Sequence, residues 1–203
     1  MRILNAEYLK TVVKPERREF SEIPEICFIG RSNVGKSSLI NRLVMRKIAR
    51  TSSTPGATKA INLYKISYES EELKKLAIFS DFPGFGYSKV AKSTYRAWES
   101  MIDTYITENV SIQKLAWAFD IRRDPDTLDK TVLEWIRYNR LPFCIILTKS
   151  DKEGRAYGLN KKEVLRKEFQ TNDIFVFSAK DGYGKEAILA HLFTTLSMQE
   201  KNY

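Results

Sequence analysis

A chain of 203 residues, 43% hydrophobic and 12% aromatic, fits one folded domain or at most two small ones. Its two cysteines lack metal-ligand or disulfide spacing, its single histidine excludes a histidine-rich metal centre, and no apolar run is long enough to span a membrane. The net charge of +9 favours a polyanionic ligand, and the absence of an N-terminal apolar signal core predicts a cytoplasmic protein without a membrane partner.

The first 24 residues precede any recognisable motif. Three apolar residues, Leu4, Tyr8 and Leu9, stand among charged neighbours, and residues 14–18 are largely basic. We interpret residues 1–24 as an N-terminal arm or an edge element, packed on a single domain that covers residues 1–203.

Residues 30–37 read G-x-x-x-x-G-K-S, the pattern of a phosphate-binding P-loop. An apolar strand at 26–29 precedes the pattern, and apolar residues at helical spacing follow it from Leu39 to Val44. In this context backbone N–H groups and the helix N-terminus converge on a phosphate chain, the lysine reaches its β- and γ-phosphates, and the serine hydroxyl binds Mg²⁺. The predicted nucleotide-binding residues here are Gly30, Arg31, Ser32, Asn33, Val34, Gly35, Lys36, Ser37 and Ser38.

The remaining elements alternate between strands and helices. We predict strands at 61–68, 76–79, 115–119, 143–147 and 174–177, with a charged hairpin turn at 69–75. We predict helices at 93–108, from an Asp124 N-cap and Pro125 to about residue 140, at 161–169 and at 183–196. This order predicts an α/β fold, a single doubly wound and mostly parallel sheet with helices on both faces.

The segment Asp81-Phe82-Pro83-Gly84 directly follows a predicted strand. A carboxylate in this position near a P-loop holds Mg²⁺, commonly through water, as a Walker-B aspartate does. The Gly84 N–H would then reach the γ-phosphate. The sequence therefore predicts Ser37 and Asp81 as metal ligands, and Phe82, Pro83 and Gly84 as part of the nucleotide site.

Two further motifs indicate that the base is guanine. Thr148-Lys149-Ser150-Asp151 follows the strand at 143–147, and an aspartate accepts both the ring N–H and the amine of guanine, which adenine cannot offer. The stem of Lys149 can lie along the purine face. Phe177 ends the next strand, Ser178-Ala179-Lys180 follows it, and the Ala179 N–H can donate to the guanine carbonyl. Because the carboxyl ends of parallel strands line one crevice, these motifs predict a GTP/GDP site.

The basic residues are unevenly distributed. No Asp or Glu occurs from Ile26 to Tyr68, although this stretch carries eight Lys and Arg residues. Arg42, Arg46 and Lys47 are expected on the outer surface of the helix after the P-loop, too far along it to reach the phosphates. They form either a surface for a larger polyanion such as RNA or a solvated basic face.

The sequence words GRSNVGKSSLIN, TSSTPGATKAINLY, DFPGFGYSKV, TKSD and SAK, in this order, resemble the EngB (YihA/YsxC) family of ribosome-assembly GTP-binding proteins, within the TrmE-Era-EngA-EngB-Septin-like P-loop GTPases. The resemblance covers essentially the whole chain. It implies that Thr58 binds Mg²⁺ and acts in catalysis with Lys36 and Gly84. It also implies a nucleotide-binding switch loop that contains Gly56, Ala57, Thr58, Lys59 and Ala60, although Ala57 stands where the family usually has a basic residue.

The same resemblance implies a partner and a rate. The partner is the large ribosomal subunit or its precursor, with its rRNA and ribosomal proteins rather than DNA, and the family is required for normal cell division and septation. Phe85 occupies the place of the glutamine that orients water in Ras-like GTPases, so we expect slow intrinsic hydrolysis. Asn33 matches the position at which potassium-stimulated relatives hold the ion, which makes K⁺ a candidate cofactor, unless Asn33 only stabilises the turn.

Three alternatives stay open on the sequence alone. A P-loop nucleotide or metabolite kinase would share residues 30–37 but would need neither TKSD nor DFPG. A GTPase of RNA modification or another RNA-linked process would share every motif, and such enzymes usually carry extra domains. A nucleotide-independent RNA-binding protein would explain the charge but neither Asp81 nor Asp151.

Overall fold

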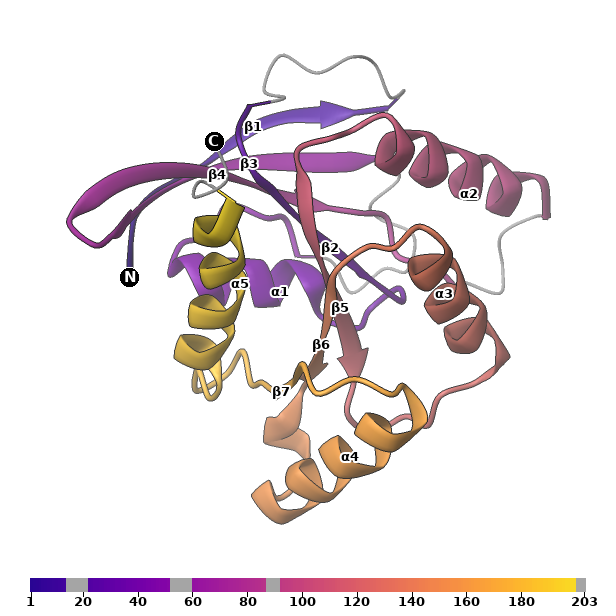
Figure 1. Ribbon diagram of the computed structural model, residues 1–203. Helices are drawn as coiled ribbons and strands as arrows, with labels where there is room; N and C mark the ends of the chain where they lie inside the picture. The colour runs from indigo at the N-terminus through magenta and orange to yellow at the C-terminus, as the bar shows by residue number, and fades with distance from the viewer. Residues whose placement is uncertain (14–21, 52–59, 87–91, 200–203) are drawn as a thin grey trace.

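The computed structural model describes residues 1–13, 22–51, 60–86 and 92–199 (Figure 1). Its strands form one seven-stranded sheet in the order β1-β3-β4-β2-β5-β6-β7. The strands are β1 (Arg2–Val12), β2 (Glu25–Gly30), β3 (Ile61–Ser70), β4 (Leu73–Asp81), β5 (Ile112–Asp120), β6 (Phe143–Thr148) and β7 (Ile174–Val176). The helices are α1 (Lys36–Val44), α2 (Lys92–Thr107), α3 (Thr127–Tyr138), α4 (Arg155–Glu168) and α5 (Lys185–Gln199), with a short 3-10 turn at Ser150–Lys152.

Most of the sheet is parallel. Strands β4, β2, β5, β6 and β7 run parallel to one another, whereas β3 is antiparallel to both β1 and β4. Helices α1 and α5 pack on one face, and α2, α3 and α4 pack on the other (Figure 1). Every residue of the central strand β2 is buried, as expected for a strand between two covered faces. The predicted α/β fold with a mostly parallel sheet is confirmed.

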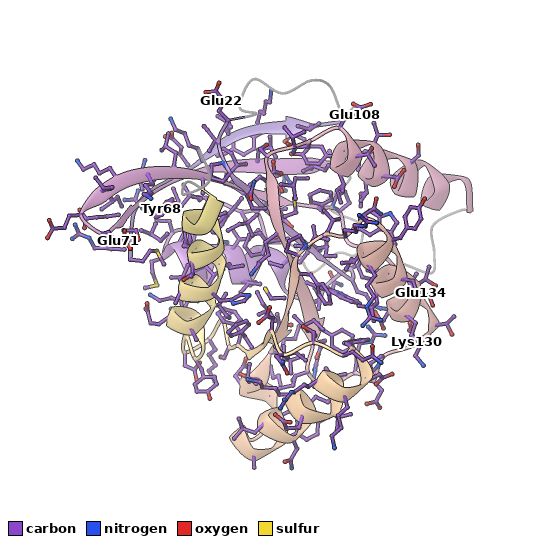
Figure 2. The ribbon with its side chains drawn as sticks, in the orientation of Figure 1. Glu22, Tyr68, Glu71, Glu108, Lys130 and Glu134 are labelled. Atoms are coloured by element: carbon purple, nitrogen blue, oxygen red, sulfur yellow. The ribbon has the colours of Figure 1, made fainter. Side chains whose placement is uncertain are left out.

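The N-terminal strand and a hairpin extend the sheet at its antiparallel edge. Residues 2–12 form the edge strand β1 beside β3. The β3–β4 hairpin turns at Glu71 and Glu72, whose φ angles are 53° and 65° (Figure 2 labels Glu71). Two consecutive left-handed residues make a tight turn whose twist matches the paired strands. The strands therefore continue through most of residues 69–75, which we predicted as a turn.

Helix α3 begins two residues later than predicted. Its N-cap is Asp126, whose carboxylate accepts hydrogen bonds from the N–H groups of Leu128 and Asp129, while the Asp129 carboxylate accepts from the Asp126 N–H. This reciprocal capping box satisfies more helix-end donors than an N-cap followed by proline can. The predicted Asp124 N-cap was wrong, and the Asp124 carboxylate instead pairs with Lys161 Nζ.

Helix α4 begins at Arg155, six residues before the predicted start at 161. Within residues 156–160 the buried position is Gly158, where a Cβ atom would lie 3.2 Å from Val176 and 3.4 Å from Ile121. Its helical neighbours at 157 and 159 are exposed. The stretch consequently has no apolar stripe, which is the signal by which sequence patterns predict a helix.

The single histidine lies at the amino ends of the strands, opposite the nucleotide motifs. The ring of His191, on α5, packs against Phe175 with a centroid distance of 4.8 Å, and its Nε2 lies 2.8 Å from Lys114 Nζ. The Asp173 carboxylate is 3.7 Å from the same nitrogen, and the buried Cys144 also interacts electrostatically with Lys114. Burial, together with the Lys114 charge, lowers the pKa of His191 below its ordinary value of 6.5.

We expect acidification to destabilise the protein through this histidine. Because the folded-state pKa lies below the unfolded value of 6.5, the unfolded chain takes up the proton first, and the free energy of unfolding falls as pH drops from about 6.5 through the folded-state pKa. Urea unfolding from about pH 8 to about pH 5 measures the effect. His191→Gln is the control, because glutamine accepts from Lys114 without titrating. If the wild type and His191→Gln lose stability in parallel as the pH falls, His191 is not the group responsible.

Candidate functional site

The P-loop connects β2 to α1 at the carboxyl edge of the parallel strands. Gly35 is the N-cap of α1 with φ at 104°, a left-handed conformation that favours glycine, and no side chain caps the helix. The first N–H groups of α1 are therefore left for a bound anion. The Lys36 side chain folds back over the loop, with Nζ 3.4 Å from the Gly30 carbonyl oxygen.

Lys36, Ser37 and Asp81 form a buried polar cluster beneath this loop. Ser37 Oγ donates to Asp81 Oδ2 at 2.8 Å, and Asp81 is only 2% exposed. Burial raises the pKa of the Asp81 carboxyl, an effect that the Lys36 charge and the Ser37 hydrogen bond oppose. Burial likewise lowers the pKa of the Lys36 ammonium, and the Asp81 charge opposes it. Each charge thus offsets part of the desolvation cost of the other.

The residues of this cluster fit a magnesium ion. Asp81 Oδ1 is buried without a hydrogen-bond partner among the described residues. A hydrated hard cation beside the serine hydroxyl would satisfy that oxygen. Within the described ranges no group of three or more His, Cys, Asp or Glu side chains is arranged to hold a metal. A cation here would therefore take some of its ligands from the protein and the others from the nucleotide phosphates, as Mg²⁺ does in phosphate-transfer sites.

The loop after β4 is fastened to the P-loop by three hydrogen bonds. The Phe85 N–H donates to the Gly30 carbonyl at 3.2 Å, and the Ser32 N–H donates to the Phe85 carbonyl at 3.0 Å. The Ser32 hydroxyl donates to the Gly84 carbonyl at 3.2 Å. Phe85 itself is 3% exposed and packs in the core on the α2–α3 side of the sheet. These bonds hold the glycine of D-x-x-G against the phosphate-binding loop.

Besides Lys36, Asp81 and Ser178, five of the predicted nucleotide-site side chains in the described part of the chain are buried in the protein interior. Phe82 is fully buried with its ring against Tyr105, at a centroid distance of 5.3 Å. The Thr148 hydroxyl donates to the Val34 carbonyl at 2.7 Å. The remaining buried residues of this set are Val34, Pro83 and Phe177. At these positions the backbone is the part that can reach a nucleotide.

Lys149 joins the base-reading motif to the P-loop. Its Nζ donates to the Asn33 carbonyl at 2.7 Å and lies 3.0 Å from Asp120 Oδ2. Arg122 donates to the Asp120 carboxylate from Nε at 2.9 Å and from Nη2 at 2.7 Å. Burial alone would raise the pKa of Asp120, but these hydrogen bonds outweigh it and hold the pKa well below its ordinary value. Sequence reasoning missed Asp120, although a carboxylate directly after a buried strand, as at Asp81, was an available signal.

The two base-reading loops are also joined to each other. The Ser150 N–H donates to the Phe177 carbonyl at 3.2 Å, and Ser178 Oγ donates to Asp151 Oδ1 at 3.4 Å. The Asp151 side chain is 16% exposed. Ala179, which follows Ser178 in the chain, is half-buried. The contact orients the Asp151 carboxylate while leaving it accessible to a base.

The structure brings the described parts of the predicted site to one edge of the sheet. The P-loop, the segment 81–84 and the segments 148–151 and 177–179 follow the carboxyl ends of β2, β4, β6 and β7. Gly56, Ala57, Thr58 and Lys59 lie outside the described residues, and Ala60 is half-buried just before β3. The constellation expected from the sequence is therefore assembled, apart from the switch loop.

Arg42 does not face outward as predicted. Its Nη2 donates to the Lys180 carbonyl at 3.3 Å, and its Nε is buried. A Cβ atom on Gly182 would lie 2.9 Å from that Nε, so the guanidinium packs directly on the loop after Ser178. Arg42 connects the helix after the P-loop to the loop that follows Ser178.

Arg46 and Lys47, unlike Arg42, lie beyond the end of the helix. Met45 has φ at 55°, a left-handed conformation that ends α1 at Val44 and places both basic residues in the following loop. An open groove of about 930 Å³ runs from here to the loop after Ser178. Its described lining contains no Asp or Glu, and its basic residues are Arg42, Arg46, Lys47, Arg50 and Lys180.

Comparison with known proteins agrees with this geometry. Residues 25–149 match the family model described as "50S ribosome-binding GTPase". A probable GTP-binding protein EngB of Syntrophus aciditrophicus is 37% identical over 95% of both chains, and one of Lactiplantibacillus plantarum is 41% identical over 93% of this chain and 94% of the relative. A crystal structure of a probable EngB has a TM-score of 0.66 at 25% identity, covering 86% of this chain and 99% of that one. Era, in a complex with MgGDPNP and nucleotides of 16S ribosomal RNA, shares the fold with a TM-score of 0.71 at 20% identity, covering 85% of this chain and 56% of that one.

The P-loop, the D-x-x-G segment fastened to it and the TKSD and SAK loops at one sheet edge define a P-loop GTPase, which binds GTP and GDP and hydrolyses GTP. The resemblance on which the sequence prediction relied is confirmed by the relatives and by the fold. The chain belongs to the EngB family of GTP-binding proteins.

We expect Asp151→Asn to convert guanine specificity into xanthine specificity. The substitution keeps the side-chain shape but turns one acceptor into a donor that faces the guanine amine. GTP affinity should fall by about 2–4 kcal/mol, because a charge-assisted bidentate pair becomes a mismatch. Xanthosine triphosphate, with a carbonyl in place of the amine, should bind the variant better than GTP. Equilibrium titration with both nucleotides measures the preference.

Asp120→Asn is the matched control for that experiment. Asp120 holds Lys149, and through it the P-loop, rather than the base edge. Asp120→Asn should therefore reduce the affinities for GTP and for xanthosine triphosphate by the same factor. If Asp151→Asn retains the wild-type preference for guanine, Asp151 is not part of the base pocket.

Proposed function

We propose that this GTP-binding protein is a nucleotide-dependent switch in assembly of the large ribosomal subunit, acting in the cytoplasm on the precursor particle. The observation that carries the proposal is a basic groove, without Asp or Glu in its described lining, that reaches the loop after Ser178, to which we assign recognition of the guanine base. The description of the matched family model, a 50S ribosome-binding GTPase, supports the same partner. By family resemblance, the switch would also be required for normal cell division and septation.

The nucleotide side of the switch follows from the buried cluster. We assign GTP and Mg²⁺ to the P-loop, with Ser37 and Asp81 as metal ligands and Thr58 as a third ligand by resemblance. Bound magnesium neutralises phosphate charge. Lys36 would stabilise the β- and γ-phosphates, and the Gly84 N–H would bind the γ-phosphate. Loss of that phosphate would release the segments 50–60 and 82–92 and change the surface offered to the particle.

The groove is suited to a phosphate backbone for reasons of charge and shape. Arg46, Lys47, Arg50 and Lys180 are exposed, so their cations are hydrated and available for exchange with phosphate counterions. The groove is open to solvent and lies between α1 and the loop after Ser178, so an extended polyanion can reach the basic residues of both segments. We propose ribosomal RNA as the occupant, with neither DNA nor a membrane as partner. Among the described residues, every helix is too short or too polar to cross a lipid bilayer.

We expect the exposed groove residues to determine particle binding without affecting nucleotide binding. A variant with Arg46, Lys47 and Arg50 changed to Ala should keep its GTP affinity and lose association with purified large subunits. The dependence of log affinity on log salt should become shallower by about 0.7–0.9 for each phosphate that the variant no longer neutralises. Co-sedimentation over a salt series measures both quantities.

Arg42→Ala provides the contrast, because Arg42 braces the loop after Ser178 and is not freely exposed. It should weaken guanine nucleotide binding and leave the salt dependence of particle binding close to that of the wild type. Undiminished sedimentation of the triple variant at moderate salt would mean that the groove is only a solvated basic surface.

A second prediction concerns how hydrolysis is driven. The Phe85 ring is buried in the core on the α2–α3 side of the sheet, and a phenyl ring cannot hold or orient an attacking water. We propose that K⁺ beside Asn33, the ribosomal partner, or both supply the missing charge stabilisation. Asn33 has φ at 60° and an exposed side chain on the P-loop, so the side chain is accessible to an ion at the phosphates. Potassium should raise turnover over sodium on the order of ten- to hundredfold.

Steady-state hydrolysis in potassium and in sodium, with and without large subunits, tests this assignment. Asn33→Ala should lose the potassium stimulation and keep any stimulation by the particle. Equal rates in both salts, with no loss in the variant, would leave the particle as the only source. Fast turnover in sodium without particles would contradict the argument from Phe85.

A further inference from the structure

The side chain of Arg31, although it belongs to the P-loop, extends to helix α3. Its Nε donates to Asp129 Oδ1 at 3.0 Å, its Nη2 donates to Asp129 Oδ2 at 3.1 Å, and Nη2 also donates to the Asp126 carboxylate. The Asp129 carboxylate is fully buried, and the Arg31 side chain is 18% exposed. Two parallel hydrogen bonds to one buried carboxylate fix the guanidinium in place. The P-loop is therefore anchored to the capping box of α3.

The same guanidinium also contacts the loop after β4. Its carbon lies 5.9 Å from the centre of the Phe85 ring, over the ring face. A Cβ atom on Gly86 would lie 3.0 Å from Arg31 Nη1, so the backbone there passes directly against the cation. Arg31 is thus packed between α3 and the Phe85–Gly86 backbone. The backbone hydrogen bonds of Phe85 to Gly30 and Ser32 hold the same junction from the other side.

We propose that Arg31 is a positioning residue for the γ-phosphate, acting through Gly84. By fixing Phe85 and Gly86, it keeps the neighbouring Gly84 on the P-loop, where a Cβ atom at Gly84 would lie 2.6 Å from Ser32 Cα. This inference rests on the proposed role of the Gly84 N–H as a γ-phosphate donor. GDP lacks that phosphate. Loss of Arg31 should therefore weaken GTP binding much more than GDP binding, whereas a purely structural role in the P-loop would weaken both equally.

A neighbouring arginine supplies a matched control. Arg123 Nη2 lies 3.1 Å from Asp126 Oδ2 and 3.5 Å from Asp129 Oδ2, so it shares the same pair of carboxylates. It belongs to the segment before α3 and not to the P-loop. Removing Arg123 changes the charge of the cluster by the same amount as removing Arg31. The packing of Arg31 on the Phe85–Gly86 backbone is kept.

The experiment is fluorescence titration of the full chain with N-methylanthraniloyl derivatives of GDP and of the non-hydrolysable analogue GppNHp, in magnesium. For Arg31→Met we expect the GppNHp affinity to fall about tenfold more than the GDP affinity, the worth of one charge-assisted hydrogen bond. Arg123→Met should leave the ratio of the two affinities within about twofold of the wild-type ratio. Equal losses for both nucleotides in Arg31→Met, or no loss, would overturn the proposal.

Two further variants keep the result decisive. Thermal unfolding shows whether Arg31→Met folds. If it does not, Arg31→Lys takes its place, because lysine retains the charge beside Asp129 but loses the paired hydrogen bonds. Arg31→Lys should lose about threefold more GppNHp affinity than GDP affinity. An unchanged ratio in that variant would also overturn the proposal. Gly84→Ala tests the underlying assignment, because its methyl group displaces the loop from Ser32. If Gly84→Ala shows no selective loss of GppNHp affinity, the γ-phosphate role of Gly84 is refuted. If Gly84→Ala shows the selective loss and the Arg31 variants do not, only the role of Arg31 is refuted.

Discussion

A loop that turns its N–H groups toward an anion leaves its carbonyl groups to be satisfied by the protein, and this requirement shapes the nucleotide site. Donors from three separate parts of the chain satisfy these carbonyl groups. The pairs are Lys36 Nζ and the Phe85 N–H with the Gly30 carbonyl, Lys149 Nζ with the Asn33 carbonyl, and Thr148 Oγ1 with the Val34 carbonyl. The phosphate loop consequently has its shape only when β4 and β6 end beside it, so that recognition of phosphate and of base depends on the same sheet register.

That dependence explains why the carboxylates at the strand ends are arranged as they are. Asp81 is buried and its pKa is raised, whereas Asp120 keeps its charge through four donors, three on Arg122 and one on Lys149. The first carboxylate retains an oxygen without a protein donor, and the second has its oxygens engaged by cations. One is therefore suited to a hydrated metal ion, and the other to holding a lysine in place.

Much of this could be predicted from the sequence, because continuous apolar runs mark buried parallel strands and each motif follows such a run. The errors arose where the deciding contact is distant or where two local signals compete. Arg42 was assigned to an outer surface because its partner, the Lys180 carbonyl, is 138 residues away in the chain. The start of α3 was misplaced because the Asp124-Pro125 pair has the pattern of a helix start, whereas the capping box that begins the helix lies two residues later. Asp120 needed no distant contact, only the rule already applied to Asp81.

The edge strand β1 has a consequence for the behaviour of the protein in solution. Among the described strands, the eleven-residue β1 pairs with β3 alone, and the other side of such a strand presents backbone donors and acceptors that a second molecule can pair with. Register shifts between Ile3 and Asn5 and between Tyr8 and Lys10 interrupt the regular ladder. Charged residues at positions 2, 7 and 10 make a flat, apolar match with another strand unfavourable. The irregularities of β1 thus act against edge-to-edge aggregation of the protein.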